Sequence, residues 1–131
     1  MAKKSTKTTL SDLELKIMQV IWRRGASNVA DVQAEIDPPL AYTTVQTVMN
    51  ILARKGKLGR RLQGRAFLYS AKITQDRALR QGVRELVDRM FGGSSEELVM
   101  SLLKNRQIDP ETLADLTQRF SSNTDKKEEG D

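Results

Sequence analysis

The chain has 131 residues, of which 38% are hydrophobic and 30% charged, and its formal net charge at pH 7 is +5. This composition is typical of a soluble globular protein, and no apolar run approaches the ~18 residues of a membrane span. The chain contains neither cysteine nor histidine, which excludes disulfides, thiolate or imidazole metal sites and catalytic triads built on those residues. We therefore expect a cytoplasmic protein that is not an enzyme and carries no cofactor or metal.

The charge is distributed unevenly along the chain. Residues 1–72 carry 13 lysines and arginines against 5 acidic residues, whereas residues 73–131 carry 9 against 12. A basic first part joined to a mildly acidic second part indicates a polyanion-binding module attached to a segment with another role. The alternative at this point is a chance fluctuation on a solvated surface.

Residues 1–9 are predicted to form a flexible basic arm, and the first helix follows it. Ser11 and Glu14 have the spacing of a capping box, and apolar residues recur behind them at helical spacing. Gly25 is a natural helix stop. The pattern predicts a helix between Ser11 and Gly25 with one buried face.

Two further helices are predicted before the chain changes character. Asn28 can cap the second helix, and the prolines after Asp37 end it. The third helix is predicted from Tyr42 to Lys55, with Gly56 in the left-handed position that follows a helix.

A β-hairpin is predicted after the third helix. Residues 58–62 and 66–70 are β-capable and flank a glycine-containing turn, although Arg60 interrupts the apolar alternation. Three helices followed by a hairpin are typical of a winged helix, in which the third helix enters the DNA major groove. We expect this domain to span residues 10–72.

Helical patterns resume at Thr74, break at Gly92-Gly93, and restart after Ser94 and again at Pro110. About fifty residues cannot easily bury a core of their own, so residues 73–120 are predicted to form a helical dimerisation domain. Folding back onto the first domain is the alternative. Residues 121–131 are predicted to be disordered. The expected interface consists of Leu79, Val83, Leu86, Val87, Met90, Leu98, Leu102, Leu113, Leu116 and Phe120.

The outward face of the third helix carries short hydrogen-bonding side chains and no charge in its first turns. Glutamine can bond an adenine edge bidentately, and threonine can bond a base or touch a thymine methyl. An ordinary polar face is the alternative. The predicted base-reading residues are Thr43, Thr44, Gln46, Thr47 and Asn50.

The densest positive cluster follows directly, and no acidic residue occurs between residues 38 and 75. Long cations at the helix end and on the hairpin suit phosphate neutralisation, which gives affinity without sequence preference. The predicted phosphate-binding residues are Tyr42, Arg54, Lys55, Lys57, Arg60, Arg61 and Arg65.

Four blocks of sequence resemble the penicillinase-repressor (BlaI/MecI/CopY) family of bacterial winged-helix transcriptional regulators. They are residues 10–22, Ala41-Tyr42-Thr43-Thr44-Val45-Gln46-Thr47, Leu52-Ala53-Arg54-Lys55-Gly56 and Gly64-Arg65-Ala66-Phe67-Leu68-Tyr69. The resemblance covers residues 9–120. It implies a mainly α fold with a small β-hairpin, made of an N-terminal winged helix-turn-helix domain and a C-terminal helical dimerisation domain. It also implies a repressor that binds a palindromic operator as a homodimer.

Two departures from the family pattern bear on induction. Copper-responsive members carry Cys-x-Cys motifs, and this chain has no cysteine, which excludes metal sensing by that route. β-Lactam-responsive members are inactivated by a sensor protease at an Asn-Phe bond, and the matching residues here are Ser101-Leu102. A protein-interaction adaptor and a non-specific nucleic-acid-binding module are the alternative functions.

Overall fold

The computed structural model describes residues 10–130, with side chains described up to residue 124. The basic arm predicted over residues 1–9 lies outside the described residues. The chain separates into two compact units, and the boundary between them follows Glu85.

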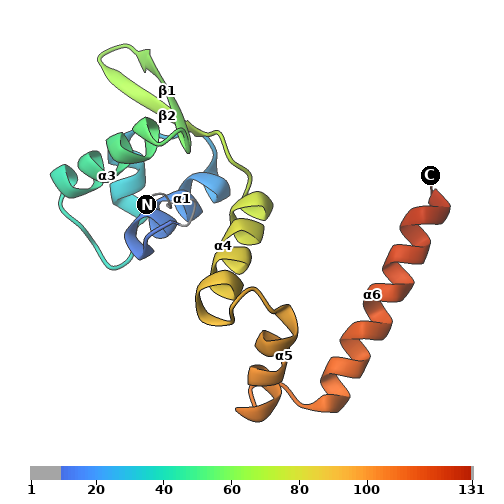
Figure 1. Ribbon diagram of the computed structural model, residues 1–131. Coiled ribbons are helices and arrows are strands. Elements are labelled where there is room, and N and C mark those ends of the chain that lie inside the picture. Colours follow the sequence, from blue (N-terminus) through green and yellow to red (C-terminus); the bar gives the residue numbers. More distant parts are fainter. Residues whose placement is uncertain (1–9, 131) are drawn as a thin grey trace. The chain divides into compact units, whose positions relative to one another are not determined.

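Three helices open the first unit, as Figure 1 shows. They are α1 (Asp12–Arg24), α2 (Val29–Glu35) and α3 (Tyr42–Arg54). The predicted capping box of α1 is present, since the Ser11 side chain accepts from the Glu14 backbone and the Glu14 side chain accepts from the Ser11 backbone. A reciprocal box between Asn28 and Asp31 begins α2. These caps explain why the helices start where they do.

A two-stranded antiparallel hairpin follows, formed by β1 (Leu58–Gln63) and β2 (Ala66–Ala71), with Leu58 opposite Ala71. Gly64 in the turn has a φ of +66°, a conformation that glycine adopts without strain. A backbone bridge between Ser27 and Tyr69 adds a short third strand position to this sheet. Three helices with this hairpin form a winged helix, and the hairpin is its wing.

The core of the first unit lies among these elements. Apolar side chains from α1, α2, α3 and the base of the wing are almost completely buried there. The core residues are Ile17, Met18, Val20, Ile21, Val29, Val32, Ile36, Val45, Met49, Leu52, Leu58, Tyr69 and Ile73. Burying one face of α3 in this cluster fixes which side chains it presents to solvent.

The first unit extends beyond the predicted boundary at residue 72. Ile73 is part of its core, Ala78 packs against that core, and the Trp22 indole Nε1 donates to the Ile73 carbonyl at 2.9 Å. The helical pattern starting at Thr74 suggested a new domain, but the first turns of this helix belong to the winged-helix unit.

The remaining helices are α4 (Gln75–Met90), α5 (Ser95–Lys104) and α6 (Pro110–Gly130). Ser94 caps α5 by accepting from the Glu97 backbone. The backbone of α6 is helical to Gly130, so the prediction of a disordered tail over residues 121–131 was wrong for residues 121–130. Lysine and glutamate are good helix formers, and no proline interrupts this stretch, so its polarity does not end the helix.

Within the described residues, no helix is long and apolar enough to cross a membrane. The same residues contain no group of acidic side chains that could hold a metal ion.

Candidate nucleic-acid interface

The first two turns of α3 present an uncharged polar surface to solvent. Thr43, Thr44, Gln46 and Thr47 are all exposed, whereas Val45 between them is fully buried. No hydrogen bond within the described residues uses the polar side-chain atoms of these four residues. Their donors and acceptors are therefore available to a ligand.

Asn50 is the last polar residue predicted on this face, and it is half-buried. Its Oδ1 accepts two hydrogen bonds, from Arg60 Nη1 and from the Tyr69 hydroxyl, both at 2.8 Å. Arg60 belongs to β1 and Tyr69 to β2. Asn50 thus connects α3 to both strands of the wing.

Aromatic contacts reinforce this connection. The Arg60 guanidinium lies over the Phe67 ring at 4.4 Å, a cation–π contact, and the rings of Phe67 and Tyr69 meet edge to face at 6.4 Å. Arg60 interrupts the apolar alternation of β1, but it has a structural role there, because its side chain reaches from the wing to Asn50 on α3.

These contacts change the roles expected for Asn50 and Arg60. The base-reading prediction for Asn50 does not fit an oxygen that already accepts two hydrogen bonds. Asn50 instead fixes the position of the wing relative to α3, because it accepts hydrogen bonds from both strands of the wing. No ion pair of the described residues includes Arg60, but its side chain is held in place by Asn50 and Phe67.

We expect Asn50→Ala to lower the free energy of unfolding by about 1–3 kcal/mol, because the buried Tyr69 would lose its acceptor. Urea denaturation measures this change. Tyr69→Phe removes only one of the two donors and is expected to cost less. Equal stability of Asn50→Ala and the unmodified chain would show that Asn50 does not hold the wing.

Lys55 does not have the role that the sequence suggested. Its Nζ lies 2.8 Å from Oε2 of Glu14, a residue of α1 that is only 6% exposed. Burial by itself raises the pKa of Glu14, but the hydrogen bond and charge of Lys55 and the Ser11 backbone N–H lower it below its ordinary value of 4.5. Lys55 thus stabilises the packing of α3 on α1, and the prediction that it binds phosphate does not fit this ion pair.

The ion pair between Glu14 and Lys55 predicts how the free energy of unfolding depends on pH. Because the folded-state pKa of Glu14 is lowered, its charge stabilises the fold above about pH 4.5, and this contribution is lost as the pH falls further. Glu14→Gln keeps the capping box and is expected to cost about 1 kcal/mol at pH 7, since Lys55 is partly exposed and screened. Urea denaturation at several pH values should show that the difference in unfolding free energy between Glu14→Gln and the unmodified chain becomes smaller at acidic pH. A double-mutant cycle with Lys55→Met is the control, and a cost that stays constant with pH would contradict the assignment.

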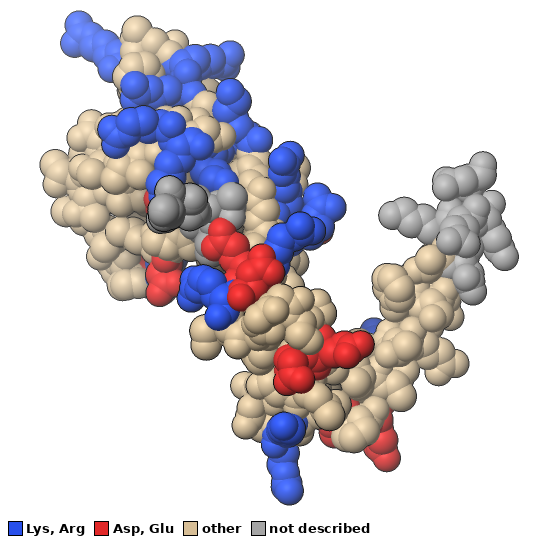
Figure 2. All heavy atoms as spheres, in the orientation of Figure 1, with Lys and Arg blue, Asp and Glu red and all other residues tan. Residues whose placement is uncertain are grey.

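The remaining cations form a basic surface around the wing, visible as the blue spheres over the hairpin in Figure 2. Arg54, Arg61 and Arg65 are exposed, and no ion pair of the described residues includes them. Lys57 is half-buried. Lys72, just after β2, also belongs to this surface but was not predicted, because the second strand separates it in sequence from the cations that end at Arg65.

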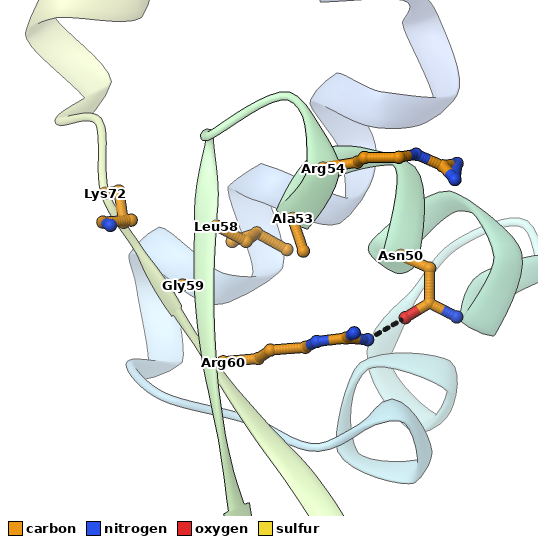
Figure 3. Close-up of a pocket in the computed structure, with 7 residues that line it drawn as sticks. All are labelled: Asn50, Ala53, Arg54, Leu58, Gly59, Arg60 and Lys72. Atoms are coloured by element: carbon orange, nitrogen blue, oxygen red, sulfur yellow. Dashed lines mark hydrogen bonds between the residues drawn. The ribbon is translucent and has the colours of Figure 1, made fainter.

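A groove lies between the end of α3 and the start of the wing, and we call it the junction groove (Figure 3). Its volume is about 530 Å³. Its lining residues are Asn50, Ala53, Arg54, Leu58, Gly59, Arg60 and Lys72.

The sequence model of the penicillinase repressor family matches residues 10–122. The chain belongs to the penicillinase repressor family. The penicillinase repressor of Bacillus licheniformis is 28% identical over 122 residues, which is 92% of this chain and 95% of that protein. The penicillinase repressor of Staphylococcus aureus is 21% identical over 109 residues, 82% of this chain and 86% of its own length.

Two solved structures are also similar to this chain. One is the solution structure of monomeric Bacillus licheniformis BlaI with the blaP half-operator, 33% identical over 52% of this chain and 85% of that chain, with a TM-score of 0.45. The other is the DNA-binding domain of the repressor BlaI, 31% identical over 55% of this chain and 90% of that chain, with a TM-score of 0.48.

Membership of the penicillinase repressor family confirms the resemblance drawn from the sequence. The family consists of DNA-binding transcriptional repressors and not of enzymes, which also confirms the prediction made from the absence of histidine and cysteine.

Proposed function

We propose that this repressor binds a palindromic operator duplex as a homodimer, with α3 reading bases in the major groove and the wing contacting the backbone. The observation that carries the proposal is the exposed face of α3, where the side chains of three threonines and Gln46 have no hydrogen-bond partner among the described residues. Such side chains bond base edges and contact thymine methyl groups.

The surroundings of this face supply affinity that does not depend on sequence. Tyr42 at the start of α3 is 45% exposed, and its hydroxyl can bond a phosphate. Arg54, Arg61 and Arg65 add positive charge at the end of α3 and on the wing. Phosphate contacts of this kind set the orientation of a protein on the duplex, whereas the base contacts select the site.

The homodimer is proposed from apolar side chains that the single chain leaves in solvent. Leu79, Val83, Leu86 and Met90 recur along α4 at helical spacing and are 42–63% exposed, and Phe120 on α6 is 71% exposed. Within the described residues, α5 and α6 do not pack extensively against each other. A second copy would cover these side chains and place two α3 helices on one duplex.

The interface that we propose is smaller than the set of residues predicted from the sequence. The proposed interface leaves out Val87, because this side chain is only 6% exposed in the single chain. Leu98, Leu102 and Leu113 are half-buried, and Leu116 is 40% exposed.

The test is a salt titration of binding to a duplex from the chain's own promoter and to a scrambled duplex of equal length. We expect the promoter duplex to bind more tightly at every salt concentration, and both affinities to fall as salt rises. Binding to neither duplex would favour a protein-interaction adaptor. Equal binding with equal salt dependence would favour a non-specific nucleic-acid-binding module.

A sensor protease stays a predicted partner. Ser101 and Leu102 lie inside α5 and are half-buried, and the Asn105 side chain donates to the Ser101 carbonyl at 2.9 Å. Proteases bind extended backbone, so cleavage between these residues requires α5 to unfold locally.

A further inference from the structure

The junction groove concentrates positive charge that the fold itself does not neutralise. Arg54, Arg60 and Lys72 line it, and none of its lining residues is acidic. Within the described residues, no ion pair includes any of these three cations. The negative end of the α3 dipole lies nearby, but it amounts to only about half a charge against three full ones.

Two of the residues that line this groove, Arg60 and Asn50, are held in position before any ligand binds. Arg60 is fixed by its hydrogen bond to Asn50 and its contact with Phe67. Because Arg60 can only donate, the oxygen of Asn50 must face it, which leaves the amide nitrogen as a further donor (Figure 3). A site whose donors are already oriented loses less entropy when it binds an anion.

Gly59 makes room for the third cation. A Cβ at this position would come within 3.2 Å of Cδ and 3.4 Å of Cγ of Lys72. The aliphatic part of the Lys72 side chain therefore lies against the backbone of β1 at Gly59, and a Cβ there would require it to shift by a few tenths of an ångström. The glycine is not needed for a left-handed turn, since no positive φ occurs there.

We propose that the junction groove binds one phosphate of the DNA backbone, with Lys72 as a phosphate-binding residue beside Arg54 and Arg60. The inference rests on the proposed operator binding and assigns a contact within it. A backbone phosphate suits the groove better than a small anion, because Asn50 and Arg54 belong to the same helix as the exposed base-reading face. A duplex held on that face has its backbone beside the wing.

Lys72→Gln in the full chain tests the assignment, with Lys104→Gln as the control, since it removes the same charge from an exposed position on α5. The readout is the slope of log affinity against log salt on the promoter and scrambled duplexes. Each lost phosphate contact lowers the slope by about 0.9, so a dimer with two grooves should lose about 2. We expect Lys72→Gln to show this loss on both duplexes, and Lys104→Gln to leave the slope unchanged. Arg61→Ala on the wing is expected to behave like Lys72→Gln.

Gly59→Ala is a second variant, in which only the flexible side chain of Lys72 has to move. We expect it to retain its thermal stability and to lower the slope in the same direction as Lys72→Gln. An unchanged slope for Lys72→Gln, with normal binding by the unmodified chain, would overturn the inference alone. A loss confined to the promoter duplex would overturn it too, because that indicates a base contact. If the unmodified chain binds neither duplex, the proposed function fails first.

Discussion

Replacing Leu79 and Met90 by glutamine is expected to convert the protein to monomers and to reduce operator affinity by about 10²- to 10⁴-fold. Both side chains are 63% exposed in the single chain, and burying each against a partner contributes about 1.5–3 kcal/mol. Without the partner, the second half-site has to bind as a separate event, and the gain from linkage is lost.

Light scattering measures the first part of this prediction, since the dimer has twice the 14.8 kDa mass of the chain. Asp88→Glu is the control, because it changes an exposed residue on the opposite side of α4 and leaves the net charge unaltered. Because glutamine is uncharged, a loss of DNA binding in the double variant would not arise from an altered net charge. An unchanged dimer in the double variant would place the interface elsewhere.

Gln46→Ala and Thr47→Ala are expected to reduce discrimination between operator and scrambled DNA by about 1–3 kcal/mol each, a factor of about 5 to 150. Neither side chain has a hydrogen-bond partner within the described part of the chain, so the stability of the free protein should not change. Removing a base contact lowers affinity for the correct site and leaves affinity for random sequence almost unaltered.

Competition binding of the two duplexes at fixed salt measures this ratio. Gln19→Ala, at an exposed glutamine on α1, is the control for the loss of a surface amide. Equal weakening on both duplexes would mean that these residues contact phosphate and do not read bases. The contrast with Lys72→Gln, which should weaken both duplexes equally, separates the two kinds of contact on one domain.

Much of the winged helix could be predicted from local sequence signals. The capping box at Ser11, the asparagine cap at Asn28 and the glycine at residue 64 each act within a few residues, so their positions in the sequence indicate element boundaries. The prediction was less successful for α6, where a polar exposed helix and a disordered tail have similar compositions.

The roles of individual polar residues were harder to predict, because they depend on contacts between distant elements. Lys55 was predicted to bind phosphate because it belongs to the positive cluster that begins at the end of the third helix, and Asn50 was placed on the DNA-facing side by helical spacing. Their partners, Glu14 on α1 and Tyr69 on β2, are 41 and 19 residues away. Lys72 likewise lines the junction groove only because the hairpin returns it to the end of α3.

The most direct test is to map the contact surface on the isotopically labelled full chain by NMR, adding the promoter duplex and the scrambled duplex at the same salt concentration. If α3 reads bases, the amide and methyl signals of Thr43, Thr44 and Thr47 will shift most with the promoter duplex and much less with the scrambled one. Signals that move only in α4 to α6, or threonine signals that do not move at all, would contradict recognition of DNA by α3.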